Sequence, residues 1–183
     1  MSYRRWSFIA ILLFAIGLIF GLATPASITS TISEDIDALE EFGGTLASLP
    51  PILTATLIFA KNASVLLFSF VLSPIFCLIP IMALTVNGWM LAIVSTIAVE
   101  KESFGFVLAA VLPHGIIELP ALILAEVAAL SFGTIVTLSL FKKERRRLVL
   151  PNFRQNLKYL MIALALLLPA AIIETYITPL FLK

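Results

Sequence analysis

The sequence predicts an all-α fold: a polytopic transmembrane helical bundle of five or six spans, organised as one domain over residues 1–183. Composition is the first reason, because 61% of the residues are hydrophobic and 13% are charged, whereas an average soluble domain is about 25% charged. The mean hydropathy of +1.10 is the second. The third is that the apolar residues gather in runs long enough to cross a bilayer, where helices satisfy their own backbone hydrogen bonds.

The first apolar run covers residues 6–23 and follows Arg4 and Arg5. Its length suits a spanning helix, which we expect to be retained. A cleaved signal peptide is the alternative, since residues 23–27 offer small side chains for a cleavage site. Gly17 and Gly21 form a GxxxG motif, which allows close helix packing within one chain or between two copies.

The connection over residues 24–50 is acidic, with five Asp or Glu and no Lys or Arg. Its apolar residues recur at helical spacing, and Thr31 and Glu34 have the spacing of a capping box. We therefore expect a short amphipathic helix along the extracytoplasmic membrane surface.

Two apolar runs follow, over residues 52–72 and 75–99. Lys61 and Asn62 interrupt the first, which is either one span with Lys61 buried against protein or an interfacial helix followed by a span. The second contains Asn87 and Gly88, a polar–glycine pair that predicts a broken or re-entrant helix. The alternative at this pair is close packing at the glycine, with the asparagine hydrogen-bonding to another helix.

The run over residues 104–141 is too long for one straight span. Pro113, His114 and Gly115 predict a break or a kink, with a short re-entrant half-helix before it and a full span after it. A stripe of small residues at four-residue spacing then predicts helix packing: Ala121, Ala125, Ala129 and Gly133. The last run, residues 159–182, is expected to kink at Pro169.

The basic residues predict the orientation. They crowd the connection over residues 142–158, which we expect to be a cytoplasmic loop, and comprise Lys142, Lys143, Arg145, Arg146, Arg147, Arg154 and Lys158. The positive-inside rule places this loop and the N-terminus in the cytoplasm of a multi-pass protein of the cell membrane. The number of crossings between two cytoplasmic markers is even, which favours five spans in total, with Lys183 outside. The loop either sets topology alone or also contacts anionic lipid or a partner.

One segment concentrates the polar chemistry. His114, the only histidine, and Glu118 are four residues apart, so they share one face of a helix. An ionisable group at membrane depth costs roughly 2.5 to 3.5 kcal/mol on insertion scales, which makes such a segment the default functional site. The predicted buried polar site comprises Asn87, Gly88, His114, Gly115, Glu118 and Glu174, with Lys61, Asn62 and Glu126 as secondary candidates. It is either a structural hydrogen-bonded cluster or a site for protons, cations or a small solute.

Several classes are excluded or disfavoured. One histidine and one glutamate fall below the ligand count of a zinc site unless Glu126, Glu174 or Asn87 joins them, so no metal or cofactor is expected. The HExxH, GxSxG and phosphate-loop motifs are absent from the sequence, and we expect no enzyme. The basic run is short and lacks interleaved aromatic residues, so nucleic acid is not an expected partner.

Four segments form a recognisable pattern: Asn62, the Asn87-Gly88 pair, the run Leu112-Pro113-His114-Gly115-Ile116-Ile117-Glu118-Leu119-Pro120-Ala121, and the terminal Ile173-Glu174-Thr175-Tyr176-Ile177-Thr178-Pro179. This pattern resembles the stage II sporulation protein M family of integral membrane proteins. The namesake of the family works with two peptidoglycan-degrading partners. The resemblance implies a membrane scaffold or partner-organising subunit that contacts the bilayer, other membrane or cell-envelope proteins, or a second copy of itself. The alternative is a small transporter or channel.

Overall fold

The computed structural model describes residues 3–25, 28 and 49–182, and within them the chain is helical with no strand. Five long helices make up the fold: α1 (Tyr3–Leu22), α3 (Pro51–Leu72), α4 (Leu78–Lys101), α5 (Phe104–Phe141) and α6 (Arg146–Ile172). Two short turns come after α6, a π-helical turn at Ile173–Ile177 and a 3-10 turn at Thr178–Leu180. Each long helix, α6 taken with its flanking turns, is long and apolar enough to cross a membrane. The predicted all-α bundle with five candidate spans is confirmed.

Two of the sequence expectations concern residues 24–50 and 52–72. Most of the acidic connection lies outside the described residues, so its amphipathic helix stays a prediction. Residues 51–72 form the single helix α3, so the alternative of an interfacial helix followed by a span is wrong. Lys61 is exposed on this helix, so the expectation that it is buried against protein is also wrong.

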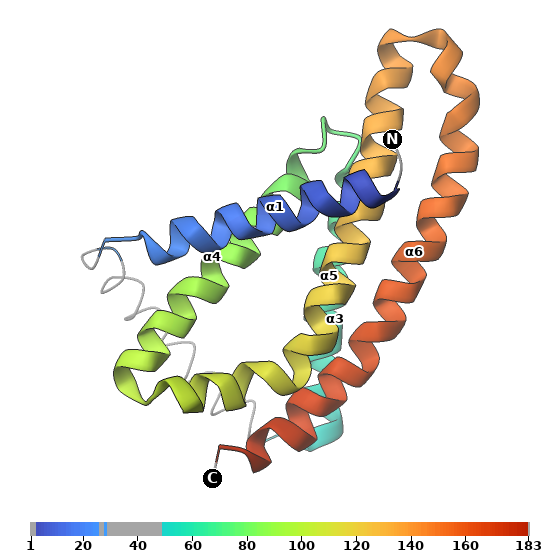
Figure 1. Ribbon diagram of the computed structural model, residues 1–183. Helices are drawn as coiled ribbons and strands as arrows, with labels where there is room; N and C mark the ends of the chain where they lie inside the picture. Colours follow the sequence, from blue (N-terminus) through green and yellow to red (C-terminus); the bar gives the residue numbers. More distant parts are fainter. Residues whose placement is uncertain (1–2, 26–27, 29–48, 183) are drawn as a thin grey trace.

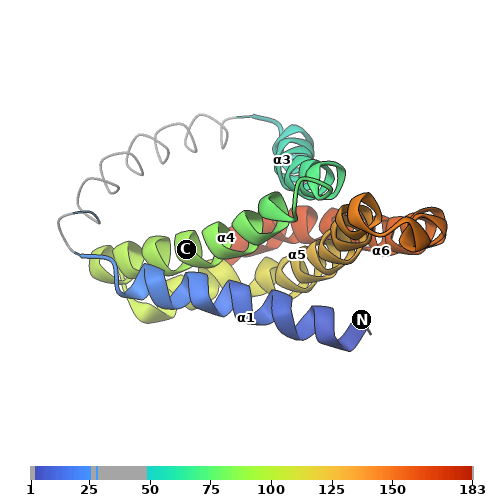
Figure 2. The same ribbon diagram turned by 90° about the horizontal axis from the view of Figure 1, so that it is seen from above.

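The helices form two groups (Figure 1). α5 and α6 make a long antiparallel hairpin, and α3 packs against both of its arms. α1 lies along α4 (Figure 2), and this pair crosses the hairpin (Figure 1). Large apolar side chains such as Phe8, Phe68 and Ile116 are exposed on the outside, as expected of surfaces that contact lipid.

Small residues let the helix backbones approach each other. A Cβ atom on Gly17 would lie 2.1 Å from the carbonyl oxygen of Thr85, and one on Gly88 would lie 2.3 Å from that of Phe14. The GxxxG motif of α1 is therefore used against α4 within the chain. The small-residue stripe of α5 also packs internally, because Ala121, Ala125 and Ala129 lie in the core cluster shared with α3 and α6.

The predicted break at Asn87 and Gly88 is absent, and that prediction is wrong. α4 continues through both residues. The side-chain amide of Asn87 donates to the carbonyl oxygen of Ala83, 2.7 Å away on the preceding turn. The helix thus satisfies this donor itself, and Gly88 serves the alternative role of close packing, against α1.

The predicted break at Pro113–Gly115 is also absent, because α5 is one helix of 38 residues that contains Pro113 and Pro120. The helix bends sharply in its first half instead (Figure 1). A proline inside a helix removes one backbone donor and crowds the preceding turn, which bends a helix that its neighbours hold together. The expected half-helix and full span are therefore joined in one bent element.

The basic connection is not the predicted loop. A 3-10 turn at Lys143–Arg145 joins the two arms of the hairpin, and α6 begins at Arg146. Most of residues 142–158 thus form the first turns of α6. The basic residues lie at the end of the hairpin where α5 and α6 are joined.

Candidate functional site

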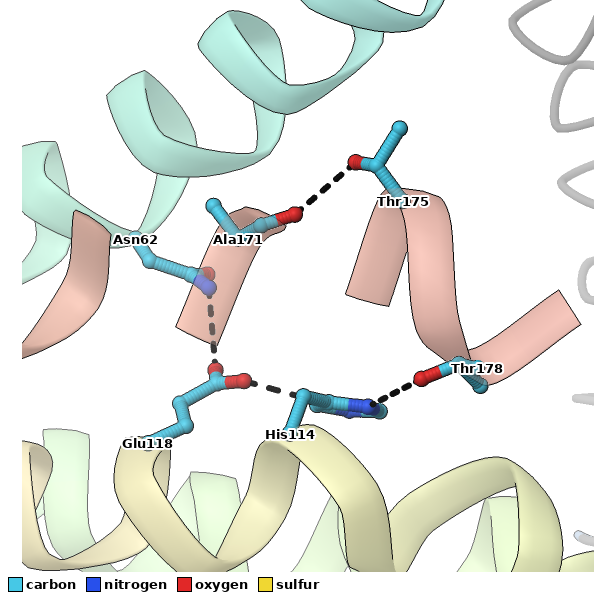
Figure 3. A network of polar contacts seen from close by, with 6 residues as sticks. All are labelled: Asn62, His114, Glu118, Ala171, Thr175 and Thr178. Carbon is cyan, nitrogen blue, oxygen red and sulfur yellow. Dashed lines mark hydrogen bonds and ion pairs between the residues drawn. The ribbon is translucent and has the colours of Figure 1, made fainter. Parts of the chain in front are cut away.

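Polar side chains from α3, α5 and the C-terminal turns converge beside the bend of α5 (Figure 3). The amide nitrogen of Asn62 donates to Oε1 of Glu118 at 2.9 Å. The other carboxylate oxygen, Oε2, lies 4.0 Å from Nε2 of His114. On the far side of the imidazole, Nδ1 lies 3.5 Å from the hydroxyl of Thr178. A chain of polar contacts therefore runs from α3 across α5 to the end of the chain.

Glu174 completes this cluster. One ligand atom each from His114, Glu118 and Glu174 lie within 4.8 Å of one another. Glu174 stands on the π-helical turn Ile173–Ile177, which comes directly after α6. A π turn inserts one extra residue into the helical repeat and so rotates the next residues around the helix axis, and such turns are frequent at functional sites.

Lys61 adds the opposite charge. It stands on α3, next to Asn62, and lies close enough to interact electrostatically with Glu118 and Glu174. Lys61 is exposed, whereas Glu118 and Glu174 are half-buried. An ammonium group at the edge of the cluster thus faces two carboxyl groups and can neutralise part of their charge.

A cavity of about 310 Å³ opens beside the cluster. Its polar lining comes from Lys61, Asn87, His114 and Glu118, and its apolar lining comes from α1, α4 and α5. A smaller cavity of about 120 Å³ also touches Lys61, Asn62, Asn87 and Glu118. The side chains of His114 and Glu118 remain 17% and 30% exposed, so the cluster is open to the surface of the helical bundle and is not sealed inside it. We call this site the polar cleft, defined by Lys61, Asn62, Asn87, His114, Glu118 and Glu174.

Gly115 and Gly88 have different positions relative to the polar cleft. Gly115 lines it, and an added Cβ there would meet only a side-chain atom of Val111, at 3.5 Å. Gly88 packs against the backbone of α1. Of the two glycines of the predicted site, the structure thus places Gly115 at the polar cleft and Gly88 in the contact between α1 and α4.

Glu126 lies apart from the polar cleft. It is fully buried two turns further along α5, where the hydroxyl of Ser69 donates to its Oε2. Its other oxygen, Oε1, has no hydrogen-bond partner among the described residues. Eight residues on a helix also rotate the side chain by about 80°, which carries Glu126 away from Glu118.

Two groups of polar residues were not singled out from the sequence. One is Thr178, which contacts His114, and its signal was the four-residue spacing from Glu174. The other is a polar cluster between α5 and α6, where the amide of Asn156 donates to Asn152 Oδ1 at 2.9 Å and to Ser131 at 3.4 Å. The four-residue spacing of Asn152 and Asn156 could have predicted that they share a helix face. The segment that contains both residues was predicted to be a basic loop and not a helix.

The fold and the polar cleft define a class, a multi-pass helical membrane protein with a half-buried acid–base cluster inside its bundle. The comparison with known families then identifies it: the family model of Stage II sporulation protein M matches residues 10–179, and the chain belongs to this family. The resemblance noted from the sequence is thereby confirmed.

Two similar proteins come from Methanocaldococcus jannaschii. The chain is 28% identical to Uncharacterized protein MJ0793 over 172 residues, which cover 93% of this chain and 92% of that protein. It is 32% identical to Uncharacterized protein MJ0706 over 123 residues, which cover 66% of this chain and 54% of that protein. No solved structure matches the chain.

Proposed function

We propose that this protein is a small non-enzymatic transporter or channel that binds a proton or a cation in the polar cleft. The observation that carries the proposal is the convergence of His114, Glu118 and Glu174 within 4.8 Å beside a cavity of about 310 Å³. Each of these side chains can take up and release a proton or a cation near neutral pH when its surroundings are suitable. Ionisable groups inside a helical bundle commonly mark the pathway of an ion.

The depth of the site supports the proposal. Lys61 and Asn87 each stand about ten residues from the start of α3 and α4, which have 22 and 24 residues. At a rise of 1.5 Å per residue this corresponds to roughly 15 Å. That is about half of the ~30 Å hydrocarbon core, and transporters place their binding sites near this midplane.

Lys61 suggests how the cleft stays balanced without a bound ion. Its ammonium group neutralises part of the charge on Glu118 and Glu174. A cation that enters the cleft takes over this role and releases the lysine. Binding and release then alternate between two electrically similar states, which lowers the cost of leaving the site empty.

The test is a flux measurement with the purified protein in liposomes. A proton gradient and a gradient of divalent cation are imposed separately, and dyes trapped inside report the decay of each. We expect wild type to dissipate at least one gradient faster than protein-free vesicles, and Glu118→Gln to lose most of this activity because the substitution keeps the shape but removes the charge. Glu126→Gln is the matched control outside the cleft and should retain wild-type flux. Wild-type rates no faster than those of empty vesicles contradict the proposal.

A scaffold role is the second candidate, and a specific surface favours it. An apolar groove of about 420 Å³ lies between α3 and α4, lined by Val65, Phe68, Met82 and Val86 among others. An apolar helix of a partner membrane protein fits such a groove. Under this function Glu118→Gln keeps its partners, whereas Ala83→Trp, which fills the groove, loses them. Quantitative crosslinking in the native membrane separates the two outcomes.

A further inference from the structure

We propose that the ion held by the polar cleft is a divalent first-row transition cation, of the kind of Zn²⁺ or Mn²⁺, with His114, Glu118 and Glu174 as its ligands. The inference rests on the proposed function, because it names the ion that the cleft would bind. It departs from the sequence expectation of no metal, since Glu174 now joins the histidine and the first glutamate.

The separations suit a metal after small side-chain movements. Zn–N and Zn–O distances are about 2.0–2.2 Å, so two ligands of one tetrahedral ion lie roughly 3.4 Å apart. The three ligand atoms now lie within 4.8 Å of one another. Side-chain rotations that move each carboxylate oxygen by about 1 Å close this gap without a backbone change, because glutamate has several free torsions.

The hydrogen bonds around the cluster leave one carboxylate oxygen of Glu118 and one ring nitrogen of His114 available to bind a metal ion. Asn62 binds Oε1 of Glu118, and Oε2 is the oxygen that faces Nε2 of His114. On the other side of the ring, the Thr178 hydroxyl approaches Nδ1. Metal-binding histidines usually donate their second ring N–H to an oxygen, which orients the ring. Nε2 of His114 and Oε2 of Glu118 therefore point toward a shared position, each supported from behind.

The donor set selects the class of cation. Two carboxylates and one neutral imidazole carry a charge of about −2, which matches a divalent ion once Lys61 has been released from them. Imidazole favours Zn²⁺ and its neighbours over Ca²⁺ and Mg²⁺, which prefer sites made only of oxygen ligands. Three protein ligands leave a position open toward the cavity of about 310 Å³, and open coordination allows an ion to be exchanged.

Binding of Co²⁺ by the full-length protein in detergent tests the inference. The protein is prepared without a polyhistidine tag and with Cys77→Ser, so that the thiol and the tag do not bind the ion. We expect one equivalent of Co²⁺ to produce a visible d–d absorption band, Zn²⁺ to displace it, and excess Mg²⁺ to leave it unchanged. His114→Gln, Glu118→Gln and Glu174→Gln should each weaken binding at least tenfold, while Glu126→Gln should not.

Size-exclusion profiles and melting curves without metal identify any variant that fails to fold. The Co²⁺ affinities of the variants that do fold are then compared with that of the parent protein. Wild-type affinity in folded His114→Gln and Glu118→Gln, or no Co²⁺ band in the parent protein, overturns the inference. The flux assay separates its failure from that of the proposed function. Proton flux without Co²⁺ binding supports the transporter function and contradicts the metal site. Co²⁺ binding without any flux supports the metal site and contradicts the transporter function.

Discussion

At the scale of single residues, a buried carboxyl group depends on its few hydrogen-bond partners. Glu126 is fully buried, and Ser69 is its one hydrogen-bond donor among the described residues. An unsatisfied polar group in such a place costs about 1–3 kcal/mol, more than an ordinary hydrogen bond contributes. The hydrogen bond between Ser69 and Glu126 therefore couples α3 to α5 about two helical turns beyond the polar cleft.

We predict that Ser69→Ala lowers the free energy of unfolding by about 1–3 kcal/mol, because both oxygens of Glu126 then lack a partner. Ser64→Ala on the same helix is the control, since its hydroxyl is exposed and binds only the carbonyl oxygen of Lys61. Thermal or denaturant unfolding in detergent measures both. Adding Glu126→Met to Ser69→Ala should recover much of the loss, because no unpaired acceptor remains. Equal stability of Ser69→Ala and Ser64→Ala would contradict the coupling.

At the scale of elements, two glycines in the middle of long helices have opposite roles. Gly88 on α4 meets the backbone of α1, and an added Cβ would lie 2.3 Å from the Phe14 carbonyl oxygen. Gly115 on α5 has only a side-chain atom of Val111 near its Cβ position, at 3.5 Å. The first glycine is a packing contact between helices, whereas the second only leaves room beside the cleft.

We predict that Gly88→Ala destabilises the protein by about 1–3 kcal/mol, because the α1–α4 pair must separate to admit a methyl group. Gly115→Ala should be neutral or stabilising by up to about 1 kcal/mol, since alanine is the better helix former. Melting temperatures of the two variants in one detergent make the comparison. Similar losses in both variants would show that the close α1–α4 contact is not the cause.

At the scale of the whole molecule, the directions of the helices agree with alternating crossings. α3 and α5 run in parallel, since Asn62 pairs with Glu118 and Ser69 with Glu126 further along both helices. α1 and α4 also run in parallel, since Gly17 meets Thr85 and Gly21 meets Trp89. A chain that crosses once with each helix gives α1, α4 and α6 one direction and α3 and α5 the other.

We predict that the hairpin end with Glu144 is cytoplasmic and that the α4–α5 connection with Glu102 is outside. The basic residues around Glu144 set this orientation. In a Cys77→Ser background, a membrane-impermeant thiol reagent applied to intact cells should label Glu102→Cys and should label Glu144→Cys only after permeabilisation. Labelling of both positions from the outside would contradict the topology.

The sequence by itself determined the class of protein, limited the number of spans to five or six, and singled out most residues of the polar cleft. Composition and run length decide these features. A segment that spans the bilayer must satisfy its own backbone hydrogen bonds, and ionisable groups persist at membrane depth only where they contact protein partners or water. His114, Glu118 and Glu174 could be singled out for that reason.

Only the tertiary structure decided which groups surround these residues. The sequence could not show that α4 continues through Asn87 and Gly88, or that α5 continues through Pro113 and Pro120 and bends without breaking, because neighbouring helices outweigh local propensity. It also could not separate Glu126, bound to Ser69, from the cleft that Thr178 and Lys61 complete. Which partner a buried charge finds depends on how distant helices pack, and that information resides in contacts between segments far apart in the chain.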